Sequence, residues 1–170
     1  IHSAHANKTR IEQWKALLEL KSMGKITYAG VANWNIKHLQ EINDADLPLP
    51  DTNQIELHPW AQQPELVEYL QNNNVHIIAY SSLVPLSTWR KKDGENSLKT
   101  KDMENEGSSV ESLFKTLANK YNVKESQILL QWALQLKYAI LPKTIKIARL
   151  QENFQFSFVI EQEDMLLIQN

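Results

Sequence analysis

The stretch TNQIELHPWAQQPELVEYLQNNNVHIIAYSSL, residues 52–83, contains a complete strand–helix–strand unit. Its first part is rich in β-prone residues and is stopped by Pro59. The segment from Gln63 spaces its apolar residues along one helical face, and a second β-prone run follows from Val75. A helix between two strands predicts a right-handed crossover and parallel pairing, so this unit predicts an α/β fold.

The alternation of strand and helix continues on both sides of this unit. Further helices are expected in the segments from Asn7, Asn35, Ser109, Glu125, Ile147 and Glu161, and further strands in the runs from Ile26 and Ala139. Asn35 is expected to cap its helix, and Gly24 to follow the end of the first one. The segment 91–107 is polar without an apolar period, which predicts a loop.

Polar side chains stand at the C-terminal ends of the expected strands, namely Asn33, Glu56, His58, Tyr80, Ser81, Ser82, Lys143 and Thr144. A (β/α)8 barrel places its working residues at this edge, and the glycine motifs of Rossmann sheets and P-loops are absent. A full barrel takes about 250 residues. We therefore interpret residues 1–170 as one partial barrel domain, the C-terminal portion of a TIM barrel from a longer protein. Four side chains are expected to face the barrel interior: Ile55, Leu57, Ile78 and Tyr80.

The composition is that of an ordinary globular protein, with 42% hydrophobic residues, 22% charged residues and a formal net charge of −2. This balance gives no reason to expect nucleic acid as a partner, and no apolar run approaches the roughly 18 residues of a membrane span. The sequence has no cysteine, which excludes disulfides and thiol chemistry and fits a cytoplasmic protein. Its histidines show no metal-ligand spacing, so we expect no bound metal.

A phosphate site is one interpretation of the stretch AILPKTIKIARLQENFQF, residues 139–156. In barrels, such a site often forms from the last loops and a helix N-terminus. Lys143 and Arg149 would add two positive charges, and an arginine can bind a phosphate bidentately. The spacing alone also fits, and by itself favours, two solvent-exposed cations at the start of a helix.

Four blocks, in family order along nearly the whole chain, resemble the aldo-keto reductase family. They are GKITYAGVANWNIKHLQEI, NQIELHPWAQQPELVEYLQNNNVHIIAYSSL, QILLQWALQ and LPKTIKIARLQENF, beginning at Gly24, Asn53, Gln127 and Leu141. A single block would be weak evidence, but four in order are highly specific. The resemblance implies a (β/α)8 barrel that reduces carbonyls with NADPH and without a metal.

The resemblance also implies cofactor contacts at individual positions. The residues expected to hold the adenosine 2′-phosphate are Lys143, Thr144 and Arg149, and those expected to contact the adenine are Glu152 and Asn153. Asn33 and Gln54 would hydrogen-bond the nicotinamide carboxamide, and Tyr80 would stack on the nicotinamide ring. Ser81 and Leu83 would lie along the pyrophosphate.

The catalytic set of the family is represented by one residue. His2, in the segment IHSAH, matches a strand end whose histidine orients the substrate carbonyl beside a tyrosine acid. The Asp, Tyr and Lys of the same set have no matching positions and are expected before Ile1. Ala32 stands where the family usually has serine, so one hydrogen bond to the carboxamide is expected to be missing. Ser82 stands where the family usually has proline.

The resemblance therefore implies an NADPH-dependent reductase of a small-molecule aldehyde or ketone, of which this chain carries most of the cofactor site. The alternative is a truncated, catalytically inactive nucleotide-binding or interaction module. The parent protein is expected to be a monomer. The chain alone is expected to be marginally stable, molten or self-associating, because a partial barrel leaves free strand edges. A tyrosine and a lysine at strand ends upstream would favour the enzyme.

Overall fold

The computed structural model describes residues 1–5, 9–86 and 113–169, which form two compact units. The first unit comprises Ile1–Glu56 and Gln62–Tyr80, and the second comprises Leu57–Ala61 and Ser81–Asn170. The loop expected at residues 91–107 lies outside the described residues.

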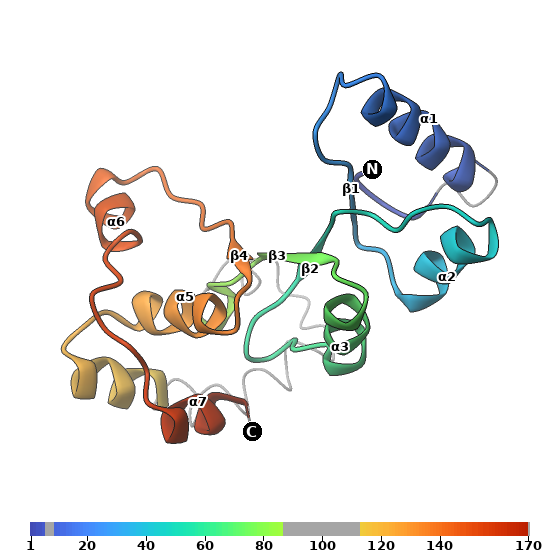
Figure 1. The fold of residues 1–170 in the computed structure, drawn as a ribbon. Coiled ribbons are helices and arrows are strands. Elements are labelled where there is room, and N and C mark those ends of the chain that lie inside the picture. Colours follow the sequence, from blue (N-terminus) through green and yellow to red (C-terminus); the bar gives the residue numbers. More distant parts are fainter. Residues whose placement is uncertain (6–8, 87–112, 170) are drawn as a thin grey trace, which may run out of the picture. The chain divides into compact units, whose positions relative to one another are not determined.

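The first unit is built on three parallel strands with β2 in the middle. The strands are β1 (Gly30–Ala32), β2 (Thr52–Glu56) and β3 (His76–Tyr80), and the helices that alternate with them are α1 (Arg10–Ser22), α2 (Ile36–Asp44) and α3 (Pro64–Asn72) (Figure 1). This arrangement confirms the α/β fold with parallel strands that the stretch 52–83 predicts. At β1, the Ile1 amino group donates to the Gly30 carbonyl and the Ala32 N–H donates to the Ile1 carbonyl, each at 2.8 Å.

Two helix boundaries in this unit lie where the sequence predicts them. The Asn35 side chain accepts from the backbone N–H of His38 at 3.0 Å, and the Asn35 N–H donates to His38 Nδ1 at 3.3 Å. This reciprocal pair satisfies donors that the first helical turn would otherwise leave free. Gly24 follows α1 with a φ of +69°, a conformation that costs glycine little.

The register of β2 and β3 contradicts the expectation that four side chains of these strands face the barrel interior together. Gln54 lies beside Ile78, and Ile55 lies beside Ala79. Because side chains alternate along a strand, Ile55 and Ile78 point to opposite faces of the sheet. The prediction that Ile55 and Leu57 share a face with Ile78 and Tyr80 is therefore wrong. It treated each strand alone, and only the pairing register relates the faces of two strands.

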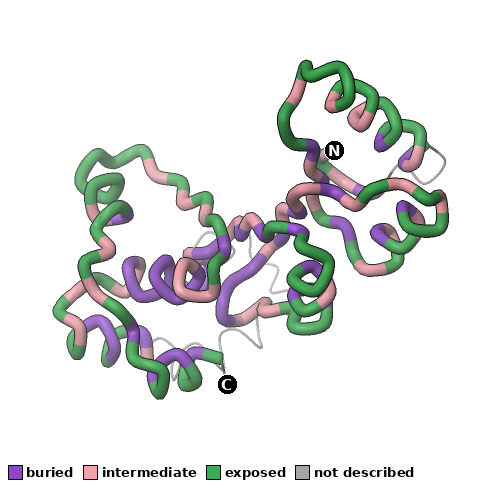
Figure 2. Tube along the Cα trace, in the orientation of Figure 1, coloured by how far each residue is buried: buried purple, intermediate pink, exposed green. Residues whose placement is uncertain are grey.

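The second unit is centred on α5 (Glu125–Gln135), whose residues from Gln127 to Ala133 are all buried. Its other elements are the 3₁₀ turn η1 (Val84–Leu86), helical residues 113–121, β4 (Ala139–Ile140), α6 (Ile147–Glu152) and α7 (Gln162–Gln169). Figure 2 shows the contrast between the buried α5 and α6, which has no buried residue. None of the described helices is long and apolar enough to cross a membrane.

Polar side chains hold the C-terminal part of this unit together. On α5, the Gln127 side chain donates to the Gln155 carbonyl at 3.0 Å. The Gln135 amide exchanges two hydrogen bonds with the Ile160 backbone, at 2.9 and 2.7 Å. These bonds hold the extended segment that follows α6 against α5.

An ion-pair cluster fixes the start of α7. Lys120 contacts Asp164 at 2.7 Å and Glu161 at 2.6 Å, and the Tyr121 hydroxyl donates to Asp164. These hydrogen bonds, that of Lys120 foremost, hold the pKa of the Asp164 carboxyl below its ordinary value.

Candidate functional site

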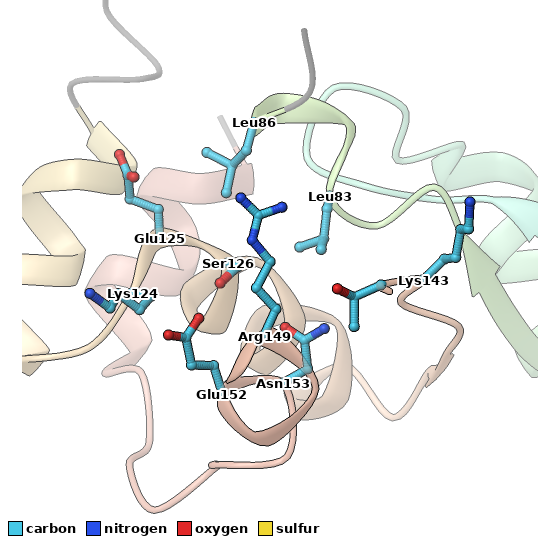
Figure 3. Close-up of a pocket in the computed structure, with 10 residues that line it drawn as sticks. Leu83, Leu86, Lys124, Glu125, Ser126, Lys143, Arg149, Glu152 and Asn153 are labelled. Carbon is cyan, nitrogen blue, oxygen red and sulfur yellow. The ribbon is translucent and has the colours of Figure 1, made fainter. Parts of the chain in front are cut away.

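A cavity of about 380 Å³ in the second unit gathers six of the ten residues expected to contact the cofactor (Figure 3). It is lined by Leu83, Leu86, Lys124, Glu125, Ser126, Lys143, Thr144, Arg149, Glu152 and Asn153. The stretch 139–156 contributes half of this lining, so the polar residues that it concentrates in sequence also meet in space.

Local structure explains how this stretch presents its side chains. Strand β4 ends before Pro142, and the Thr144 hydroxyl accepts from the Lys146 N–H at 3.1 Å just ahead of α6. Arg149 and Asn153 are four residues apart, which places them on one side of the helix. In Figure 3, Arg149 projects into the middle of the group, with Glu152 and Asn153 on either side of its stem.

Two of the cations that line the cavity make no ion pair within the described part of the chain. Within the described parts of the chain, the side chains of Lys143 and Arg149 have no hydrogen-bond or ion-pair partner. Both residues are exposed, and with Lys124 they set three cations against the carboxylates of Glu125 and Glu152. Unpaired guanidinium and ammonium groups around one cavity favour an anionic ligand, for which Arg offers a planar fork of donors.

Four lining residues escaped the sequence-based prediction: Leu86, Lys124, Glu125 and Ser126. Three of them belong to the start of α5, which the sequence marks only as a helix beginning after a break at Asn122. The bond from Gln127 to Gln155 brings this start close to the segment that follows α6. No pattern of neighbouring residues predicts a contact between residues that are 28 positions apart in the sequence.

A second group of predicted residues meets at the C-terminal ends of the strands in the first unit. The Tyr80 hydroxyl donates to Asn33 Oδ1 at 2.8 Å. The Asn33 backbone N–H donates to the Gln54 carbonyl at 2.8 Å. Asn33 directly follows β1, Gln54 lies within β2 and Tyr80 ends β3, so the parallel pairing of the strands brings these three residues close together.

His2 lies beside this group. Its carbonyl accepts from Asn33 Nδ2 at 3.4 Å, and its side chain is exposed. His2, Gln54 and Ile78 are among the residues that line a cavity of about 340 Å³ in the first unit. His2 is therefore exposed beside this cavity, with its backbone held by the Asn33 amide.

Two strand ends adopt a left-handed backbone. Asn33 has a φ of 61° and Ser81 has a φ of 60°. Such conformations cost a non-glycine residue free energy and concentrate at functional sites. Ser81 directly follows β3 and is half-buried, but it does not line the cavity of the second unit.

Comparison with known proteins identifies relatives over the full chain. The model of the Aldo/keto reductase family matches residues 1–170. The methylglyoxal reductase DkgA of Yersinia pestis is 34% identical over 93% of this chain and 51% of its own length. The NAD(P)H-dependent D-xylose reductase of Scheffersomyces stipitis is 34% identical over 91% of this chain and 47% of its own length.

A solved structure has the same fold. The aldo-keto reductase MGS-M4, from a deep-sea metagenome library of the Medee basin, matches with a TM-score of 0.80 at 26% identity. The match covers 99% of this chain and 57% of MGS-M4. The chain thus spans about half the length of the curated relatives it matches, and the neighbouring structures are barrels in which parallel strands alternate with helices.

Proposed function

The chain belongs to the aldo/keto reductase family, and from this premise we propose that it carries most of the NADPH site of a carbonyl reductase. When bound, the nicotinamide would supply the hydride that converts an aldehyde or ketone to an alcohol. Residues 1–170 would form part of one barrel domain. The residues of the chain would bind the cofactor, orient its ring and hold the substrate carbonyl.

The 2′-phosphate would be bound by Lys143, Thr144 and Arg149. The observation that carries this proposal is the pair of unpartnered cations around one cavity. A phosphate monoester brings about −1.5 to −2 charges and three acceptor oxygens, which these donors could satisfy. NADH lacks this group, so the site would favour NADPH.

The other cofactor contacts are proposed residue by residue within each unit. Glu152 and Asn153 would meet the adenine, and Leu83 and Ser81 would lie along the pyrophosphate. Asn33 and Gln54 would hydrogen-bond the nicotinamide carboxamide, since each amide side chain has a donor and an acceptor that match those of the carboxamide. The Tyr80 ring would stack on the nicotinamide, and a defined ring orientation decides which face donates hydride.

His2 would orient the substrate carbonyl, because an imidazole N–H can donate to a carbonyl oxygen. A positioned proton donor contributes typically about 10²–10⁴-fold to such a reaction. No tyrosine of this chain stands in the family's motif for that acid, so we expect the 170-residue chain alone to lack turnover. An inactive nucleotide-binding module would bind NADPH equally well, and turnover by a longer protein that includes this chain would separate the two functions.

The test is a titration of NADPH and NADH into the wild-type chain, Arg149→Ala and Lys146→Ala. Lys146 is an exposed cation three residues from Arg149 that does not line the cavity, so it controls for a general loss of charge. A hydrogen-bonded charge pair contributes about 1.5–3 kcal/mol, so Arg149→Ala should weaken NADPH binding by roughly 10–100-fold.

NADH binding should change little in either variant, and Lys146→Ala should bind NADPH almost as the wild type does. Equal losses of NADPH and NADH affinity in Arg149→Ala would refute the 2′-phosphate assignment. If Arg149→Ala and Lys146→Ala weaken NADPH binding equally, the cofactor is attracted by general positive charge and not by a specific contact with Arg149.

A further inference from the structure

A buried amide lies in the middle of β2, one residue before Gln54. The Asn53 side chain is fully buried, and its neighbours across the sheet, Val31 and Ile77, are buried apolar residues. Asn53 Nδ2 donates to the Trp34 carbonyl at 2.8 Å, whereas Oδ1 has no hydrogen-bond partner within the described residues. An apolar side chain would be the ordinary occupant of such a position, because burying an incompletely satisfied amide is unfavourable. The bond to Trp34 is therefore the feature that distinguishes Asn53 from its neighbours.

The Trp34 carbonyl belongs to the turn that carries Asn33. Two consecutive residues of β2 hold this turn. The Gln54 carbonyl accepts from the Asn33 N–H, and the Asn53 side chain donates to the Trp34 carbonyl. Because Asn33 has a left-handed φ of 61°, the turn needs such bonds to persist. Loss of the Asn53 bond weakens this restraint, although Tyr80 and the His2 carbonyl still contact the Asn33 amide, and a relaxed backbone would turn that amide away from its present direction.

The Trp34 ring is anchored separately from its backbone. It is fully buried, with the Arg10 guanidinium 5.8 Å from its centroid and the His38 ring edge-on at 6.0 Å. The core can therefore keep this ring in place while the peptide of the turn changes conformation. This separation lets a substitution at Asn53 alter the turn without emptying the core.

We propose that Asn53 is a positioning residue that holds the Asn33 turn in the conformation that recognises the nicotinamide carboxamide. Asn53 acts through the Trp34 carbonyl and contacts no ligand. The inference rests on the proposed function in one respect, the contact between Asn33 and the carboxamide. It assigns to Asn53 and Gln54 two different tasks: Gln54 presents its side chain to the ligand, and Asn53 fixes the turn that carries Asn33.

The test uses the full 170-residue chain with two variants and one control. Asn53→Leu removes the donor at similar volume, and Asn53→Ala removes the donor and leaves a cavity. Ile77→Val is the control, because it trims a buried side chain adjacent to Asn53 on β3 without touching the turn. Each protein is titrated with NADPH and with adenosine 2′,5′-bisphosphate, which carries the 2′-phosphate but no nicotinamide, and its urea unfolding is measured.

Both Asn53 variants should lose roughly tenfold in NADPH affinity, about one hydrogen bond's worth. They should keep their affinity for the bisphosphate within about twofold, and Ile77→Val should keep both affinities. The two Asn53 variants should lose NADPH affinity equally although the alanine variant is less stable. A merely structural role would instead make the loss of affinity follow the loss of stability.

Other outcomes overturn the inference in distinguishable ways. Equal losses for both ligands, unfolding of both variants, or unchanged NADPH affinity would make Asn53 an ordinary core residue. If the wild-type chain binds the two ligands equally well, the nicotinamide contributes nothing, and the positioning role is wrong while the phosphate assignment stands. If the wild-type chain binds neither ligand, the proposed function itself fails and the inference falls with it.

Discussion

Replacing Gly30 with alanine should destabilise the first unit, although this change usually stabilises a strand. Gly30 pairs with Thr52, and a Cβ added at Gly30 would lie 2.2 Å from Thr52 Oγ1 and 3.3 Å from the Thr52 carbonyl oxygen. Ordinary contacts of this kind begin at 3.4 Å, so the hydroxyl has to move by more than 1 Å. The carbonyl needs only a small adjustment. The hydroxyl of Thr52 is therefore the atom that requires glycine at this position.

The two opposing effects have different sizes. Overpacking a well-packed site costs about 1–3 kcal/mol, whereas replacing glycine by alanine without strain stabilises by about 0.4–1 kcal/mol through the unfolded chain. The net expectation for Gly30→Ala is a loss of about 1–2 kcal/mol. In the Thr52→Ala background the clash is removed, so the same substitution should change stability by less than about 0.5 kcal/mol.

Urea unfolding of the wild type, both single variants and the double variant measures this coupling, with circular dichroism and tryptophan emission as probes. Thr52→Ala alone reports the cost of the missing hydroxyl and methyl. If Gly30→Ala is as stable as the wild type, the close approach of β1 and β2 is wrong. If the double variant shows no recovery, the strain does not come from the Thr52 side chain.

Two further predictions concern the second unit and the chain as a whole. Asp164→Asn should lower the free energy of unfolding more than Glu161→Gln, because Lys120 contacts both carboxylates but only Asp164 is buried. The pKa of Asp164 is held below its ordinary value of about 3.9, so its contribution is complete above that pH and is lost as the pH falls. The gap between the wild type and Asp164→Asn should therefore stay constant from pH 7 to about pH 4 and narrow as the pH falls further, and a gap that widens in acid contradicts the ion pair. The purified chain mixed with NADPH and an aromatic aldehyde should consume no NADPH, and turnover near that of a full-length reductase would mean that another side chain serves as the acid.

Features encoded locally were predictable from the sequence. The Asn35 cap, the glycine after α1 and the strand–helix–strand unit at 52–83 depend on neighbouring residues and on periodicity. The polar residues of the stretch 139–156 line one cavity, but their spacing alone favours exposed cations, and it is the family resemblance that implies a shared site.

Features that depend on pairing between distant segments were not predictable in the same way. The faces of Ile55 and Ile78 follow from the register of β2 and β3, which the pattern within either strand does not contain. The part of the cavity supplied by α5 depends on the contact between Gln127 and Gln155. Asn53 went unnoticed because a buried amide in a strand has no sequence signal until its acceptor across the sheet is known.

The most direct test of the central claim is the ³¹P resonance of the 2′-phosphate when NADPH is bound to the chain. A phosphate monoester has a second pKa of about 6, and cations around it favour its dianionic form. If Lys143 and Arg149 bind this group, the bound 2′-phosphate should titrate at a lower pH than in free NADPH, and Arg149→Ala should return it towards the free value. A bound cofactor whose 2′-phosphate titrates as it does in water would contradict the assignment of the cavity as the 2′-phosphate site.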